Sequence, residues 1–242
     1  RKNKSNQSQT WLLKCLYELD HQSDFYEQLD YLINQGENNS VIGSYTSRAK
    51  IKHGVNRENP FCNEPLDYVL TQDLEQKCDF QDVFVNGAVK ILNEGNVQNK
   101  YQNLITKGIQ TSGNVFGQMG PYAKRIQDII LMEVENYRLR FKESSEGLIS
   151  SWPSNYRLDG WLVSMKNGGA IQPHMHEQGW ISGSVYINVP PKVKEDSGNL
   201  VVCVGSETKQ TAQSKSIDVV TGSLCLFPSS LLHYTIPFES NE

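Results

Sequence analysis

The stretch 168-GGAIQPHMHEQGWISGSVYINVP-190 decides how the C-terminal half of this chain is interpreted. It holds two of the chain's five histidines, His174 and His176, and His233 follows in 222-GSLCLFPSSLLHYTIP-237. Side chains at positions i and i+2 of a strand point to the same face, so His174 and His176 are expected to lie together. Imidazole binds iron, zinc, copper and nickel, and the three histidines therefore predict a metal site. Unrelated surface histidines are the weaker alternative, because all three fall within strand-like segments.

The segments around these histidines read as short strands separated by turn residues. They cover 170–176, 180–190, 198–205, 216–228 and 231–238. The chain before Pro153 is largely helical in pattern, with clear helices expected over 81–93 and 122–141. Short strands after a helical half predict an α+β fold, with a sandwich or barrel backed by helices.

The N-terminal residues 1–56 form a separate helical segment in this interpretation. Three amphipathic stretches, 10–20, 23–36 and 38–54, are joined by short connections, with Thr10 as a candidate N-cap and Gly36 and Gly54 as stops. The segment is either the end of a helical-repeat array or a helical cap on the domain formed by 57–242.

Composition excludes several classes of protein. The chain has 242 residues, a net charge of −4, a pI of about 5.8 and a mean hydropathy of −0.51. A general nucleic-acid binder would show a basic face, and a membrane protein would need an apolar run of about 20 residues. The five cysteines show no CxxC spacing, and the start shows no signal-peptide pattern, so a cytoplasmic protein is expected.

A carboxylate and two cysteines are the further candidate ligands. A common iron site has two histidines and one carboxylate, but the expected carboxylate position is occupied by His176. Glu177 has the wrong strand parity to join His174, so we expect it to face solvent. Cys203 and Cys225 lie in strand patterns and are expected in the core.

The segments HMHEQGWISGSVYINVP, SGNLVVC and GSLCLFPSSLLH resemble the iron(II)- and 2-oxoglutarate-dependent oxygenase superfamily. They are most similar to a bacterial and phage branch that often follows tetratricopeptide-type repeats. The strong matches cover 161–237. The resemblance implies a double-stranded β-helix, or jelly roll, that binds Fe(II) and takes 2-oxoglutarate as co-substrate.

The resemblance also implies roles for individual residues. His174, His176 and His233 are the expected metal ligands, with His176 at the place of the superfamily's carboxylate. In the alternative, two histidines and water bind the metal and His176 only hydrogen-bonds beside them. The expected co-substrate residues are Trp161, Ser182, Ser184, Tyr186 and Asn188, and Gly183 is expected to allow a close backbone approach.

One departure concerns the arginine that usually pairs with the 5-carboxylate of 2-oxoglutarate. The resemblance places it about ten residues after His233, beyond Glu242, together with a final strand of the jelly roll. We therefore expect this end of the domain to lie outside the sequence given.

The expected activity is hydroxylation of an unidentified substrate with release of succinate and CO2. The substrate is a peptide or protein side chain, docked on the N-terminal helices, or a small metabolite. One alternative is a cupin-type metalloenzyme without 2-oxoglutarate, since Gly168 and the HMH triplet match the start of that pattern. Its expected glutamate is missing, because Trp180 and Ile181 stand there. The other alternative is a non-catalytic interaction module; structural zinc fits poorly without nearby cysteines.

Overall fold

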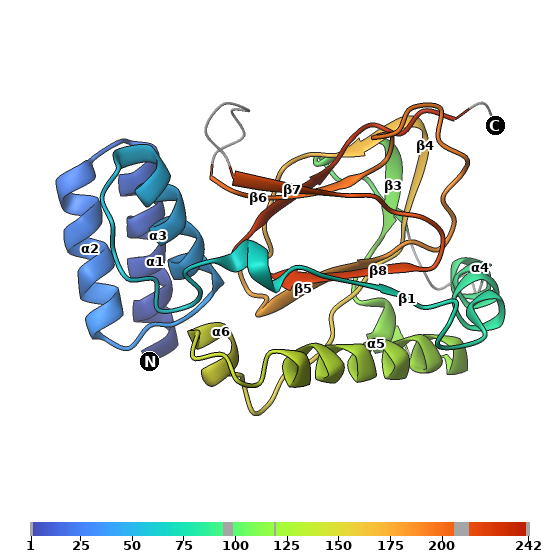
Figure 1. The fold of residues 1–242 in the computed structure, drawn as a ribbon, viewed down its shortest axis with the longest axis horizontal. Coiled ribbons are helices and arrows are strands. Elements are labelled where there is room, and N and C mark those ends of the chain that lie inside the picture. The colour runs from blue at the N-terminus through green and yellow to red at the C-terminus, as the bar shows by residue number, and fades with distance from the viewer. Residues whose placement is uncertain (1, 94–98, 119, 206–212, 241–242) are drawn as a thin grey trace.

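The computed structural model describes residues 2–93, 99–118, 120–205 and 213–240. Three helices near the N-terminus lie on one side, and the strands with one long helix form the rest of the molecule (Figure 1). All of the paired strands are antiparallel. The predicted combination of helices and sheets in an α+β fold is therefore confirmed.

The N-terminal helices are α1 (Lys2–Glu18), α2 (Gln22–Asn34) and α3 (Ser40–His53). They enclose their own hydrophobic cluster, which we call the helical core; its fully buried members include Leu13, Phe25, Leu29 and Ile42. The Asn39 side chain caps α3 by accepting hydrogen bonds from the first amides of the helix, and Gly54 ends it at φ 70°. The expected cap at Thr10 was wrong, because α1 begins eight residues earlier and Thr10 lies inside it.

A run of short elements and one long helix follows these three helices along the chain. It comprises η1 (Pro65–Tyr68), β1 (Leu70–Asp73), η2 (Gln81–Asn86), α4 (Gly87–Asn93), β2 (Asn99–Lys100), β3 (Ile105–Thr111), η3 (Val115–Gln118), α5 (Pro121–Arg140) and α6 (Gly147–Ser150). The predicted helix over 81–93 exists, although its first part, η2, is π-helical. The helix predicted over 122–141 corresponds to α5.

The remaining strands are β4 (Val163–Ile171), β5 (Ile181–Val185), β6 (Leu200–Val204), β7 (Gln213–Ile217), β8 (Ser223–Pro228) and β9 (Leu232–Thr235). They pair into sheets of order β1-β8-β5, β2-β3-β4 and β7-β6-β9. An isolated bridge between His174 and His233 connects the end of the β4 segment to β9.

Strand β8 shows how the core is divided. Leu224 and Leu226 belong to the cluster that contains residues of α5, which runs along the outer side of this sheet in Figure 1. Cys225 and Phe227 alternate with them and belong to the cluster that contains Leu200 of β6. This period of two buries both faces of β8. Cys203 and Cys225 are both buried, as expected for core residues.

The predicted strand over 170–176 was wrong beyond Ile171, where β4 ends. Pro173 has no amide proton to give to a ladder, and it interrupts strand pairing before His174. His174 therefore lies in a single bridge, and His176 lies outside any strand. The predicted strand over 180–190 is likewise shorter, because regular pairing of β5 ends at Val185.

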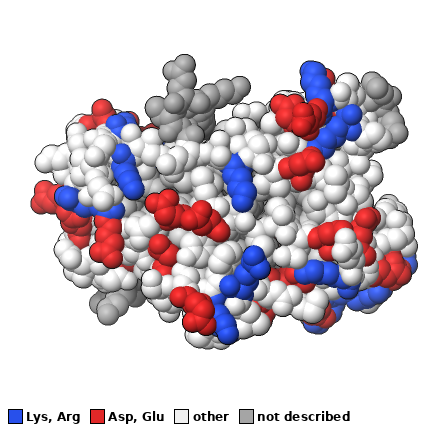
Figure 2. Space-filling view, in the orientation of Figure 1, with Lys and Arg blue, Asp and Glu red and all other residues white. Residues whose placement is uncertain are grey.

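The surface carries charges of both signs. On the face drawn in Figure 2, basic and acidic side chains of the described residues are interspersed. Among the described helices, none has the length and apolar character that a membrane crossing requires.

Candidate metal centre

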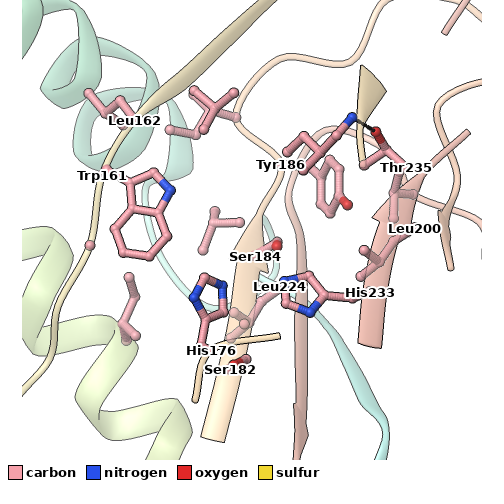
Figure 3. Close-up of a pocket in the computed structure, with 18 of the residues that line it drawn as sticks. Trp161, Leu162, His176, Ser182, Ser184, Tyr186, Leu200, Leu224, His233 and Thr235 are labelled. Atoms are coloured by element: carbon pink, nitrogen blue, oxygen red, sulfur yellow. Dashed lines mark hydrogen bonds between the residues drawn. The ribbon is translucent and has the colours of Figure 1, made fainter. Parts of the chain in front are cut away.

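Three histidines from two parts of the chain, the segment after β4 and strand β9, converge in one cavity. One ring nitrogen from each of His174, His176 and His233 lies within 4.8 Å of the others. Their ring centroids are 4.2 Å apart for His174 and His233, 5.0 Å for His176 and His233, and 5.1 Å for His174 and His176. Figure 3 shows the rings of His176 and His233 directed toward each other.

The backbone holds two of the three histidines tightly. The amide of His174 donates to the carbonyl of His233 at 3.1 Å, and the amide of His233 donates back at 2.8 Å. His233 also pairs with Val202 of β6 within the regular sheet. His176 lacks this support, and its carbonyl accepts one turn hydrogen bond from Gly179 at 2.9 Å.

The hydrogen bonds around the rings leave nitrogen lone pairs available. Nδ1 of His174 lies 2.8 Å from the carbonyl of Gln172, which only accepts, so Nδ1 carries the proton and Nε2 keeps its lone pair. Nδ1 of His233 is buried and makes no hydrogen bond of normal geometry with any described residue. A buried polar atom of this kind needs a partner that the protein itself does not supply.

The protein environment keeps all three rings neutral at physiological pH. Burial lowers the pKa of His174, and burial together with the neighbouring His174 lowers the pKa of His176 to about 4. Burial, followed by the other two imidazoles, lowers the pKa of His233 well below its ordinary value. Neutral imidazole is the form that binds metal, so the donor set fits an ion such as Fe(II), Zn(II), Cu(II) or Ni(II).

Glu177 does not join the histidines. Both of its carboxylate oxygens accept from Nζ of Lys14 in α1, at 2.6 and 2.8 Å. Its side chain is 45% exposed, which agrees with the expected position outside the metal site. No carboxylate is therefore part of the histidine cluster within the described residues.

The five predicted co-substrate residues all line the same cavity. Ser182 and Ser184 of β5 share a face with Tyr186, which follows the strand, and the three residues lie beside the histidines in Figure 3. The hydroxyl of Ser182 is already engaged, since it lies 2.7 Å from the hydroxyl of Ser229. Burial raises the pKa of Tyr186, so its phenol stays protonated, and its hydroxyl makes no hydrogen bond to a described residue.

Trp161 and Asn188 lie further toward solvent. The indole ring of Trp161 lies 5.3 Å from the ring of His176, and 37% of the residue is exposed. Asn188 is exposed at the far end of the β5 segment. Gly183 faces the opposite way, and an added Cβ there would lie 2.7 Å from the Cys225 carbonyl oxygen. The expected close backbone approach at Gly183 is confirmed.

Sequence reasoning missed one polar residue at the site. Thr235 lines the cavity, and its hydroxyl accepts a hydrogen bond from the amide of Ile171 at 2.8 Å, which ties β9 to β4 (Figure 3). Thr235 follows His233 by two positions in the same strand, so strand parity could have identified it. The cavity that these residues enclose has a volume of about 1720 Å³.

Comparisons with known proteins agree with this arrangement. Residues 159–242 match the family described as "Putative 2OG-Fe(II) oxygenase", and the matched segment contains every residue of the candidate site. Comparison with curated proteins gives no match.

Two solved structures align with this chain. A prolyl hydroxylase from Trichoplax adhaerens, in complex with a hypoxia inducible factor oxygen degradation domain peptide fragment, aligns with a TM-score of 0.52 and 12% identity. That alignment covers 82% of this chain and 86% of the other. A Pseudomonas putida prolyl-4-hydroxylase aligns over 71% and 86% of the two chains, with 15% identity and a TM-score of 0.48.

The family implies Fe(II) as the metal and 2-oxoglutarate as the co-substrate, and the three neutral histidines could bind iron. Residues 159–242 are thus similar to the family of putative 2-oxoglutarate- and Fe(II)-dependent oxygenases.

Proposed function

We propose that this protein is a dioxygenase that hydroxylates a substrate C–H bond and releases succinate and CO2. The observation that carries the proposal is the cluster of three imidazoles, whose nitrogens lie within 4.8 Å of one another inside the cavity. The proposed scaffold is a double-stranded β-helix, supported by the antiparallel sheets and by the fold of the Trichoplax enzyme.

In this proposal His174, His176 and His233 hold the iron. The hydrogen bond from Nδ1 of His174 to Gln172 orients that ring and leaves Nε2 as its ligand atom. When bound, iron supplies the site at which 2-oxoglutarate is decarboxylated and oxygen is activated for insertion into the substrate. The alternative assigns the iron to His174 and His233 alone, with His176 as a hydrogen-bonding neighbour.

The surrounding residues bind and shield the reactants. Tyr186 and Ser184 present hydroxyl groups on the histidine side of β5, where they can donate to the carboxylates of 2-oxoglutarate. The hydroxyl of Ser182 bonds to that of Ser229 and so supports the histidine side of β5, and Asn188 lies at the outer end of this side. The Trp161 indole lies 5.3 Å from the His176 ring, and in this proposal it limits the access of water to the metal.

The cavity is larger than a typical pocket for one small ligand, which is roughly 300–1,000 Å³. Its volume of about 1720 Å³ leaves room for a substrate beside the co-substrate. We propose a peptide or protein side chain as the first substrate class to test, and a small metabolite as the second. Exposed apolar side chains of α1 and α2, Trp11, Leu12 and Tyr31, support the peptide alternative, because a docked chain could cover them.

The decisive experiment is an anaerobic titration of the purified protein with Fe(II) and then 2-oxoglutarate. We expect a visible charge-transfer band that disappears in His174→Ala and in His233→Ala. His21→Ala is the matched control, because His21 is an exposed histidine of the N-terminal helices and should leave the band intact.

Other outcomes of this titration separate the rival functions. Iron binding without the band would favour a cupin-type site that does not use 2-oxoglutarate. Iron and 2-oxoglutarate binding without succinate release, with any peptide or metabolite offered, would favour a non-catalytic interaction module. Absence of metal binding would refute the proposed function.

A further inference from the structure

The segment that carries His176 is held by the N-terminal helices rather than by a sheet. Regular pairing of β4 ends at Ile171 and does not resume until β5 begins at Ile181. Within this gap, His174 has its bridge to β9, whereas the backbone of His176 makes, with the described residues, only the turn hydrogen bond to Gly179. Something else must fix the position of the second histidine.

The residues on either side of His176 contact the three N-terminal helices α1, α2 and α3, which together we call the helical unit. Met175 packs against the helical core formed by α1, α2 and α3. The carboxylate of Glu177 binds Nζ of Lys14 at 2.6 and 2.8 Å, and the Lys14 side chain is only 14% exposed. The backbone carbonyl of Glu177 accepts a hydrogen bond from the hydroxyl of Ser40 at 2.9 Å, and Ser40 is buried.

These contacts differ from an ordinary surface ion pair, which contributes little to a fold. They join an apolar contact, a two-oxygen ion pair and a backbone hydrogen bond within three consecutive residues. In an extended chain, neighbouring side chains point to opposite sides. His174 and His176 therefore share the side of the cavity, while Met175 and Glu177 are anchored on the helices.

We propose that Lys14 and Ser40 are positioning residues that hold His176 in the orientation needed to bind the metal. The helical unit is then part of the metal site, although none of its residues reaches the metal. This inference rests on the proposed function, because it assigns His176 to metal binding. Anchors in α1 and at the first residue of α3 would make the site depend on two helices distant in sequence.

The test uses the whole chain and two measurements. Hydrogen exchange of the backbone amides in 174–179 reports the order of the segment without metal. Titration with Co(II) alone gives the metal dissociation constant without any turnover. The variants are Lys14→Glu, which places a second carboxylate beside Glu177; the exchanged pair Lys14→Glu with Glu177→Lys; and Ser40→Ala, which removes only a hydroxyl.

Asp30→Asn is the matched control. Asp30 of α2 pairs with Arg57 at 3.4 Å, and its side chain is 47% exposed, similar to the 45% of Glu177. The Asp30→Asn substitution breaks an ion pair of similar exposure that makes no contact with the segment of His176. Thermal melting of each variant verifies that the fold is retained.

We expect Lys14→Glu to accelerate exchange in 174–179 and to raise the Co(II) dissociation constant about tenfold, the lower end of the effect of losing an outer-shell partner. Ser40→Ala should change the exchange rate and the Co(II) dissociation constant in the same direction but by less. The exchanged pair should return both quantities to the parental values, and Asp30→Asn should leave both unchanged. Unchanged exchange, or faster exchange with unchanged Co(II) affinity, would overturn the proposal. If the parent protein binds no Co(II), the proposed function is refuted. Hydrogen exchange in 174–179 then still decides whether Lys14 and Ser40 hold the segment of His176.

Discussion

Replacing Tyr186 by Phe removes a hydroxyl that faces the cavity and makes no hydrogen bond to a described residue. The metal-free protein should therefore lose almost no stability. If the hydroxyl donates to a carboxylate of 2-oxoglutarate, the variant loses a charge-assisted hydrogen bond of about 1.5–3 kcal/mol. Since roughly 1.4 kcal/mol corresponds to a factor of ten, the dissociation constant for 2-oxoglutarate should rise about 10- to 100-fold.

Tyr137→Phe also removes one phenol hydroxyl, but it should lower folding stability and leave the affinity for 2-oxoglutarate unchanged. The hydroxyl of Tyr137 donates to the carbonyl of Tyr68 at 2.7 Å, and its ring is fully buried against Phe141 and Trp152. Losing this bond should cost about 1–2 kcal/mol of folding stability, and each kcal/mol lowers Tm by about 2–4 °C in a chain of this size. Its affinity for 2-oxoglutarate should stay unchanged, because the Tyr137 hydroxyl bonds to the Tyr68 carbonyl, and neither residue lines the cavity.

The assay is an anaerobic titration of 2-oxoglutarate into the iron-loaded protein, followed by its visible band, together with thermal melts of the metal-free variants. Iron affinity, measured beforehand, should be the same in both variants and the parent. A Tyr186→Phe protein with parental affinity for 2-oxoglutarate would refute the assigned role. A loss of stability equal to that of Tyr137→Phe would show that the Tyr186 hydroxyl has an internal partner after all.

Two further substitutions test the packing and the ligand set. Gly183→Ala should lower the free energy of unfolding by about 1–3 kcal/mol, because the added Cβ would lie 2.7 Å from the Cys225 carbonyl oxygen. Gly117→Ala is the control with a smaller expected loss, because its Cβ meets nothing nearer than 3.9 Å. Equal melting temperatures of the two variants would contradict this prediction. His176→Asp should retain more iron affinity than His176→Ala in an anaerobic competition titration, because the carboxylate can replace the imidazole as ligand. Equal losses would favour the site in which only His174 and His233 bind iron.

Strand parity explains what could be predicted from the sequence. Ser182, Ser184 and Tyr186 alternate along one segment, and the structure places all three on the cavity side. The same rule accounts for Thr235 two positions after His233. Helix α5 and the end of α3 at Gly54 could also be predicted from the sequence, because the spacing of apolar residues and a glycine at a helix end are local signals.

The rest depended on contacts between distant residues. The segment of His176 was expected to be a strand because its residues alternate, yet Pro173 interrupts the pairing and the histidine lies in a loop. Glu177 was expected to face solvent, and 45% of its side chain is exposed, but the sequence did not predict that its carboxylate also binds Lys14. Its partner Lys14 is 163 residues away in sequence, and no local pattern indicates that pair.

The proposed set of three histidine ligands would have an electrostatic consequence. A carboxylate in the position of His176 would reduce the net charge of an Fe(II) site by one, whereas three neutral imidazoles leave the full charge of the ion. Two unit charges about 5 Å apart interact by roughly 3 kcal/mol at the effective dielectric of a partly buried site. A site without a carboxylate should therefore attract an anionic co-substrate more strongly. The pairing of Glu177 with Lys14 contributes to this effect, because it keeps the nearest carboxylate in sequence neutralised and directed away from the histidines.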